Sequence, residues 1–136
     1  MPAFNFSKQF VNLVESGRKR QTIRAMRKRG NAKIGQTAYL YTGLRTSKCR
    51  KIGEGEIIRV RKIKIRRQLF QQATLMNEEG TRYEANFAGI YEMYGLQNVA
   101  IKDGFDSWAD MTDWFLPGDK QEFEGYLIEW GPLKGL

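Results

Sequence analysis

The stretch IIRVRKIKIRR, residues 57–67, is the most β-rich part of the chain and decides the expected fold. Its β-branched residues alternate with cations, which is typical of a strand with one buried and one solvated face. The alternation changes parity, because Ile58 takes one parity and Ile63 the other. Such a switch, near Arg61 and Lys62, indicates a β-bulge or a bend of the kind that turns a barrel corner. We therefore expect a curved sheet.

Other segments of the sequence predict further strands. QTAYLYTG, residues 36–43, and FEGYLIEW, residues 123–130, both alternate apolar and polar residues. The β-branched pair Thr22 and Ile23 indicates the start of another extended segment. Residues 71–87 contain a glycine-centred turn, and both a hairpin and a loop fit them.

Three short helices are expected around these strands. The first is predicted over residues 8–16, with Ser7 as its N-cap and Gly17 as its stop. A second, with Leu96, Val99 and Ala100 at helical spacing, is predicted to end near Gly104. A third is predicted to begin after Ser107, whose acidic partner three positions later completes a capping box. This order of elements predicts an α+β domain built on a small twisted β-barrel with short flanking helices.

The composition bounds the class of protein. A chain of 136 residues that is 41% hydrophobic suits one globular domain, residues 1–136. No apolar run approaches the roughly 18 residues that span a bilayer, and the start MPAFNFSKQF lacks the features of a signal peptide. We therefore expect a cytoplasmic protein without a membrane partner.

The chain contains no histidine and one cysteine, Cys49. These absences exclude an internal disulfide, a structural zinc site and a histidine-containing catalytic triad built from this chain alone. Any catalysis would use a lysine or a carboxylate as its base. Although a carboxylate-only Mg²⁺ site stays open, we expect no metal site and no cofactor.

The formal charge of +8 is unevenly distributed along the sequence. Residues 1–67 hold 19 lysines and arginines against three acids, and residues 68–136 hold four against twelve, which gives +16 and −8. If this polarity survives folding, one face has a positive potential suited to phosphate backbones. Alternatively, the two halves interleave and neutralise each other. A third possibility is that the protein is an interaction module that binds other proteins through its acidic second half.

The octamer GRKRQTIR, residues 17–24, concentrates four cations around one threonine. A basic turn between a helix and a strand is the simplest structural interpretation, with Thr22 and Arg24 on one strand face. The octamer also contains the pattern G-x-K-x-x-T-x-R, in which the lysine is Lys19. This pattern resembles the signature of the ASCH domain family, a PUA-like group of small β-barrels.

Two later segments extend the resemblance. GQTAYLYTG, residues 35–43, and DGFDSW, residues 103–108, resemble later landmarks of the family, so the resemblance spans residues 4–130. It implies a cleft on the barrel that binds RNA or modified bases. One bacterial branch hydrolyses N4-acetylcytidine with a lysine, a threonine and a carboxylate, and another member of the family is reported to cut RNA.

On this chain the resemblance implies Lys19, Thr22 and Asp103 as the reactive group. The amidohydrolase branch carries a glutamate where this chain has Asp103. Independently of the family, Arg18, Arg20 and Arg24 lie close to Lys19 in the sequence, and neighbouring cations lower the pKa of a lysine. Lys19 is therefore a candidate base for Thr22 or for a water molecule, with Asp103 orienting an exocyclic amide.

Binding of RNA or of a modified nucleoside is the leading hypothesis, and an amidohydrolase and a ribonuclease are the alternatives. The basic stretch 57–67 is either a solvated strand face or a track for an RNA backbone. Aromatic side chains on the polar side of residues 37–42 are candidates for stacking on an unpaired base, whereas Trp108 is expected in the core. The predicted ligand contacts are Arg18, Arg20, Arg24, Tyr39, Tyr41, Arg59, Arg61 and Lys64.

Overall fold

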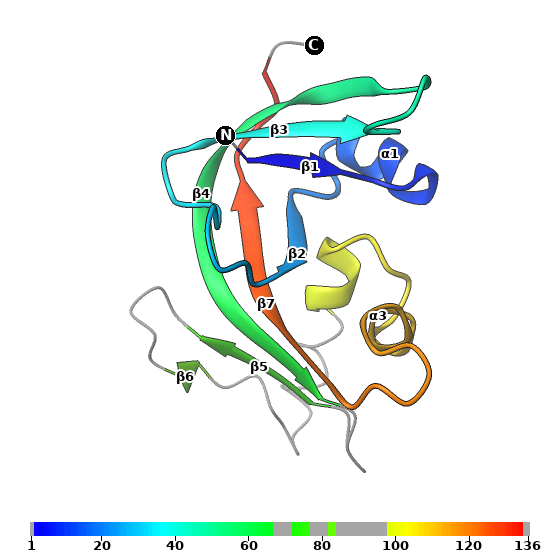
Figure 1. Ribbon diagram of the computed structural model, residues 1–136, viewed down its shortest axis with the longest axis vertical. Helices are drawn as coiled ribbons and strands as arrows, with labels where there is room; N and C mark the ends of the chain where they lie inside the picture. Colours follow the sequence, from blue (N-terminus) through cyan, green and yellow to red (C-terminus); the bar gives the residue numbers. More distant parts are fainter. Residues whose placement is uncertain (1, 67–71, 77–81, 84–97, 135–136) are drawn as a thin grey trace.

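The computed structural model describes residues 2–66, 72–76, 82–83 and 98–134 (Figure 1). Within them, seven strands form one mixed sheet, which confirms the α+β class. The elements in chain order are β1 (Ala3–Asn5), α1 (Lys8–Glu15), β2 (Gln21–Ala25), β3 (Thr37–Thr42), β4 (Arg50–Arg66), β5 (Gln72–Met76), β6 (Arg82–Tyr83), α3 (Trp108–Phe115) and β7 (Glu122–Trp130). A further helical segment covers residues 98–102.

Strand β4 is 17 residues long and organises the sheet, running through it as one long curved ribbon (Figure 1). It pairs with β3 over residues 50–56, with β7 over residues 57–66 and with β5 over residues 63–66. All these pairings are antiparallel, whereas β1 pairs with β3 in parallel. The curved sheet expected from the sequence is confirmed.

The irregularity in β4 lies earlier than the sequence predicted. The register with β7 shifts between Ile57 and Arg59, so the bulge falls at Ile58 and not near residues 61–62. Ile58 is 53% exposed, while Ile57 and Ile63 are both buried. The predicted position was wrong because it depended on Ile58 as a buried residue, whereas the buried residues Ile57, Ile63 and Ile65 all share one parity.

The sheet is not closed. Its strand order is β1-β3-β4-β5-β6, with β7 pairing to β4 and β2 pairing to β7. Among the described residues, no backbone pairing joins β1 to β2, so a closed barrel is not confirmed. A side-chain bond crosses the opening instead, because Arg24 Nη2 on β2 donates to the carbonyl oxygen of Asn5 on β1 at 2.8 Å.

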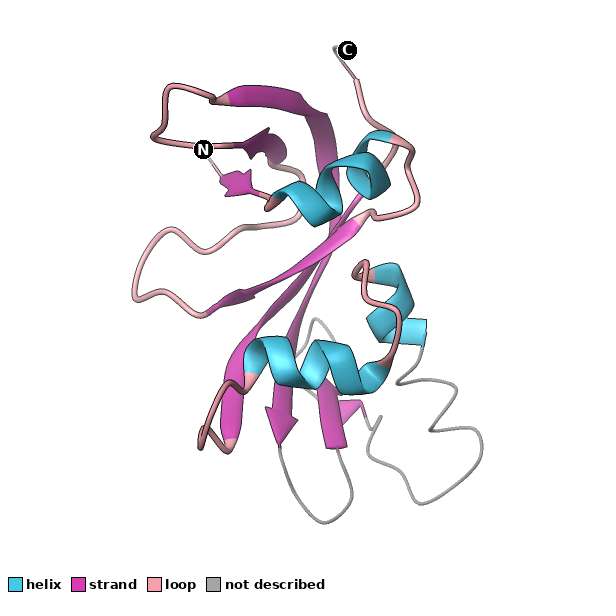
Figure 2. Ribbon diagram, turned by 90° about the vertical axis from the view of Figure 1, so that its right-hand side faces the viewer, coloured by secondary structure: helices cyan, strands magenta, loops and turns pink. Residues whose placement is uncertain are grey.

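The helices lie on the concave side of the curved strands (Figure 1), and they cover the strands in the view turned by 90° (Figure 2). Helix α1 begins after Ser7, the predicted N-cap position, although the Ser7 side chain makes no capping bond. Gly17 follows the helix in the left-handed conformation, as predicted. Helix α3 begins after Ser107, whose hydroxyl accepts from the backbone N–H of Asp110 at 3.1 Å, which confirms the expected cap. The expected helix before Gly104 is present over residues 98–102.

The core fills the space between the helices and the inner face of the sheet. The predicted burial of Trp108 is confirmed. The largest fully buried apolar side chains are Val14, Leu40, Ile52, Ile57, Ile63, Ile65, Met111, Leu116, Leu127 and Trp130. In the segment 71–87, β5 and β6 pair antiparallel, which favours the hairpin, although the turn residues themselves lie outside the described part. Leu96, which the sequence assigned to the second helix, also lies outside it.

Candidate functional site

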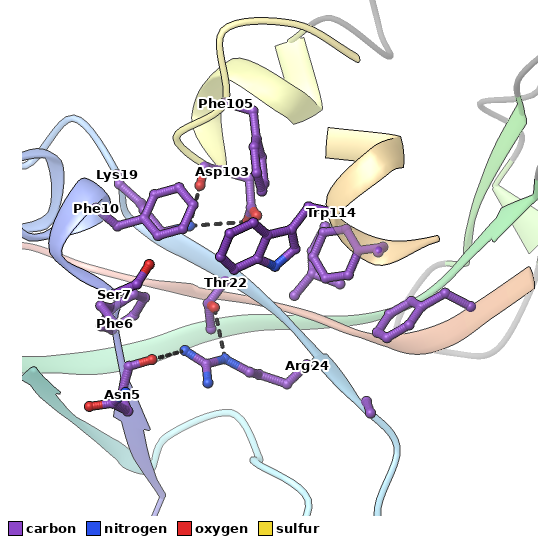
Figure 3. Close-up of a pocket in the computed structure, with 14 residues that line it drawn as sticks. Asn5, Phe6, Ser7, Phe10, Lys19, Thr22, Arg24, Asp103, Phe105 and Trp114 are labelled. Carbon is purple, nitrogen blue, oxygen red and sulfur yellow. Dashed lines mark hydrogen bonds and ion pairs between the residues drawn. The ribbon is translucent and has the colours of Figure 1, made fainter. Parts of the chain in front are cut away.

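A cavity of about 340 Å³ opens where the edges of β1 and β2 face each other without pairing (Figure 3). Its size lies within the range of small-molecule binding sites. Three parts of the chain line it: residues 5–10 around the end of β1, residues 19–25 around β2, and residues 103–115 together with Phe123. The cavity therefore joins the basic octamer to the DGFDSW segment.

The end of helix α1 directs Lys19 into this cavity. Gly17 has a φ of +79°, and the backbone N–H of Lys19 then donates to the carbonyl oxygen of Leu13 at 2.9 Å. This reversal turns the chain into β2 and points the lysine side chain inward, where only 2% of it is exposed. A lysine at this depth requires a partner, because an unpaired buried cation is strongly unfavourable.

The turn after residues 98–102 supplies that partner. The N–H of Phe105 donates to Ala100 at 2.9 Å and that of Gly104 to Ile101 at 3.0 Å, which is the bonding pattern of a Schellman motif. Gly104 has a φ of +99°, and a Cβ atom there would lie 2.8 Å from Phe10 Cδ1. Glycine is required for both reasons, and it allows Asp103 to approach Lys19.

Lys19 and Asp103 form a buried ion pair. Lys19 Nζ lies 3.3 Å from Asp103 Oδ1 and also donates to the backbone carbonyl oxygen of Asp103. Gln21 braces the same carboxylate, because its Nε2 lies 3.4 Å from Oδ1 and 3.2 Å from the carbonyl oxygen of Val99. Lys19 and Gln21, two side chains that are nearly completely buried, thus fix the carboxylate at the cavity wall.

Burial shifts the pKa values of both partners toward their neutral forms. Desolvation lowers the pKa of Lys19, and this effect outweighs the opposing attraction of Asp103. Desolvation likewise raises the pKa of Asp103, although the charge of Lys19 and the bond from Gln21 oppose the shift. The predicted direction of the Lys19 pKa shift is confirmed, but its main cause differs from the prediction. Burial lowers the pKa most, and the nearby cation Arg24 contributes less.

Thr22 and Arg24 share one face of β2, as the sequence predicted. Arg24 Nε donates to Thr22 Oγ1 at 3.0 Å, and the guanidinium carbon lies 5.3 Å and 5.2 Å from the ring centres of Phe4 and Phe6. Burial lowers the pKa of Arg24, while the charge of Asp103 opposes the shift. Because Arg24 supplies a hydrogen to Oγ1, the hydroxyl hydrogen of Thr22 is free to bond elsewhere.

Aromatic rings surround the polar group, and the sequence did not predict them as site residues. Phe10 packs against Phe105 and Trp114 with centroid distances of 5.3 Å and 5.6 Å, and Trp114 is 50% exposed at the cavity (Figure 3). Phe105 follows Asp103 by two positions, so the DGF motif itself carried a signal. Helical periodicity alone could not separate Phe10 and Trp114 from core residues.

Several predicted contacts lie away from this cavity. Tyr39 and Tyr41 are half-buried on β3 and do not line it, and Tyr39 instead contacts Lys51. Arg18 and Arg20 are exposed and line a separate hollow of about 350 Å³. The structure therefore brings together Lys19, Thr22, Arg24 and Asp103, and it separates them from the other predicted ligand contacts.

The cations of β4 face the acids of β7. Arg59 and Arg61 both pair with Glu129, at 3.4 Å and 2.9 Å. Lys64 pairs with Glu122 and Glu124, at 3.1 Å and 3.0 Å. The two charged halves of the sequence thus interleave at this strand pair, as the neutralising alternative predicted, which weakens the case for an RNA track along β4.

No protein-family model, curated protein or solved structure matches the chain. The described residues contain no helix long and apolar enough to cross a membrane. They also contain no group of three histidine, cysteine, aspartate or glutamate residues placed to hold a metal ion.

Proposed function

We propose that this cavity binds a single nucleobase, presented by a modified nucleoside, a nucleotide or an unpaired position of RNA. The observation that carries the proposal is a polar group made of buried Lys19, Thr22 and Asp103 and half-buried Arg24, which lines a cavity of about 340 Å³ together with aromatic rings. A nucleobase has flat apolar faces and a polar edge. The aromatic rings of the cavity can stack on the faces, and the polar group can form hydrogen bonds with the edge.

The polar group favours a base that carries an exocyclic amine. The carboxylate of Asp103 accepts hydrogen bonds, and acidic side chains pair with the amino group of cytosine. Lys19, Thr22 and Arg24 provide donors for the ring carbonyl and ring nitrogen of the same base. Uracil has a carbonyl where cytosine has an amine, and that carbonyl would face the carboxylate unfavourably.

The positions that carry the ASCH resemblance and the positions that line this cavity coincide at Lys19, Thr22, Arg24 and Asp103. This coincidence supports the proposal that the chain is an ASCH-type, PUA-like domain. On this view the opening between β1 and β2, bridged by Arg24, corresponds to the mouth of a small barrel.

The direct test is a binding titration of cytidine, N4-acetylcytidine and uridine. We expect the two cytidines to bind at least about tenfold more tightly than uridine, a difference of about 1.4 kcal/mol. Asp103→Asn should lose most of this preference, and Arg24→Gln should weaken binding of all three. Arg20→Gln removes the same charge outside the cavity and serves as the control. Equal binding of cytidine and uridine would contradict the proposal.

Hydrolysis of an N4-acylated cytidine is the second candidate, and the contact between Arg24 and Thr22 favours it. Thr22 Oγ would attack the acyl carbon while neutral Lys19 takes the hydroxyl proton. The resulting tetrahedral oxyanion would then expel the cytosine amine, which takes the proton back from the Lys19 ammonium. Water would hydrolyse the remaining threonine ester to release the acid and regenerate the hydroxyl.

This reaction requires the hydroxyl of residue 22, whereas base binding does not. We expect Thr22→Val to bind N4-acetylcytidine and release no cytidine, while Thr22→Ser retains measurable turnover. Turnover by Thr22→Val equal to that of the wild type would exclude Thr22 as the nucleophile. If the wild type binds the nucleoside but never releases cytidine, hydrolysis is excluded and binding is the remaining function.

A further inference from the structure

A second cavity, of about 390 Å³, adjoins the candidate site along the same strand edges. Arg24 and Ala25 line both cavities. Strand β1 also extends along both cavities, since residues 3–4 line the second cavity and Asn5 lines the first. Arg24 therefore stands at the boundary, and its guanidinium group contacts both Phe4, which lines the second cavity, and Phe6, which lines the first.

The second cavity carries an excess of positive charge. Arg24, Arg27 and Lys33 line it, and no acidic residue does so among the described residues. Neither Arg27 nor Lys33 forms an ion pair with any residue that the structure describes. Arg27 is close enough to lower the pKa of Arg24. Cations held together in this way repel each other, and a bound anion would relieve the repulsion.

The loop that carries these cations is held in place by its own side chains. Asn31 Oδ1 accepts from the backbone N–H of Arg27 at 2.9 Å, and Asn31 Nδ2 donates to the carbonyl oxygen of Arg27 at 2.7 Å. Gln36 Oε1 accepts from the N–H of Lys33 at 2.9 Å, and the next turn bonds to β4. Holding the loop in advance reduces the ordering entropy lost when an anion binds.

Arg24 is suited to serve both cavities at once. Its Nε and Nη2 donate to Thr22 and to the Asn5 carbonyl, and these bonds use only part of the guanidinium donor set. Guanidinium groups bind phosphate oxygens through paired donors, which a lysine cannot reproduce. An anion on the far side of Arg24 would therefore meet a donor whose position the first cavity already fixes.

We propose that the second cavity is a phosphate-binding site and that the phosphate belongs to the nucleotide whose base occupies the first cavity. The ligand class is thus a phosphorylated nucleotide, free or within a strand, and not an unphosphorylated nucleoside. The assignment of a phosphate site stands on the second cavity alone, whereas the assignment of a nucleotide rests on the proposed function.

The first experiment follows backbone amide shifts by NMR during titration with inorganic phosphate or diphosphate. We expect saturable shifts at residues 27–36 in the wild type and in Lys28→Gln/Arg29→Gln, whose substituted cations are exposed on the same loop and do not line the cavity. Arg27→Gln/Lys33→Gln removes the same charge from the cavity wall and should lose the shifts. Equal shifts in the two double variants, or none in the wild type, would overturn the phosphate site.

The second experiment compares the affinities of cytidine with those of its 5′- and 3′-monophosphates. At least one monophosphate should bind tenfold or more tightly than cytidine, and Arg27→Gln/Lys33→Gln should abolish this gain without weakening cytidine. Lys28→Gln/Arg29→Gln should keep the gain. Cytidine binding without any gain from phosphate would overturn this inference and leave the proposed function intact. Phosphate shifts at residues 27–36 without binding of any base would overturn the nucleotide assignment together with the proposed function.

Discussion

Lys19 Nζ contacts Asp103 twice, at the backbone carbonyl oxygen and at the carboxylate, although the two residues lie 84 positions apart in the sequence. Both side chains are almost completely buried, and Gln21 bonds the same carboxylate. This contact joins the segment after α1 to the turn before α3. It thereby places one carboxylate and one cation in the wall of the cavity.

The energetic coupling of this pair gives the first prediction. Lys19→Met and Asp103→Asn should each lower the free energy of unfolding by about 3 kcal/mol or more, because each leaves a buried charge without its partner. The double variant should lose less than the sum of the two, since it leaves no unpaired charge. Urea denaturation of all four proteins measures the coupling, and additive losses would show that the pair contributes no coupling.

The same pair predicts the pH dependence of stability. Burial lowers the pKa of Lys19 from its ordinary 10.5 and raises the pKa of Asp103 from 3.8. Just below pH 10.5 the unfolded chain holds a proton that the folded pair has released, so the pair's contribution to stability rises with pH. Just above pH 3.8 the folded pair holds the extra proton, so its contribution rises as the pH falls.

Wild type and Lys19→Met/Asp103→Asn should therefore diverge at both ends of the pH range. The difference in unfolding free energy should change by no more than about 1.4 kcal/mol per pH unit in each window and stay flat between them. Denaturation at a series of pH values measures it. A wild type that loses stability relative to the double variant toward either end would contradict the assigned pKa directions.

Gly104 provides a prediction about how the site is built. Gly104→Ala must adopt a positive φ and also brings Cβ to 2.8 Å from Phe10, whereas Gly118→Ala meets the positive φ alone, with no atom within 4 Å. We expect Gly118→Ala to lose about 1–2 kcal/mol of unfolding free energy. Gly104→Ala should lose clearly more and should also weaken nucleoside binding. Equal losses in thermal or urea unfolding would show that the close approach to Phe10 is unimportant.

Arg24 bridges the strand edges that leave the sheet open, and this bridge gives a further prediction. Arg24→Lys keeps the charge but cannot make both bonds to Thr22 and Asn5. Amide hydrogen exchange near Asn5 should therefore accelerate in Arg24→Lys. Exposed Arg20 offers the matched change, and Arg20→Lys should leave exchange there unchanged. Wild-type exchange rates in Arg24→Lys would show that the bridge does not hold β1.

Local sequence signals were sufficient for much of the fold. Ser7 and Gly17 bracket α1 as predicted, and Ser107 caps α3, because caps and left-handed glycines act over a few residues. Strand β1 was not predicted, since three residues are too few to show an alternation. Its parallel pairing with β3 depends on contacts between distant segments.

The site was predictable only in part, for a physical reason. The spacing of Lys19, Thr22 and Arg24 is local and could be recognised, whereas the approach of Asp103 was expected only from the family resemblance. The sequence left open whether the two charged halves neutralise each other, because the outcome depends on the register that sets Arg59 opposite Glu129 and Lys64 opposite Glu124. Pairing registers of this kind are decided by the whole sheet.

The most direct test of the central claim is an NMR titration of the wild-type protein with N4-acetylcytidine and cytidine, followed at assigned backbone amides and at the indole N–H of Trp114. The account predicts saturable shifts at Trp114, at residues 5–7 and 19–25, and at residues 103–105, all of which belong to the cavity wall or its immediate neighbours. Absence of saturable shifts there, or shifts centred on Tyr39, Tyr41 and the cations of β4, would contradict it.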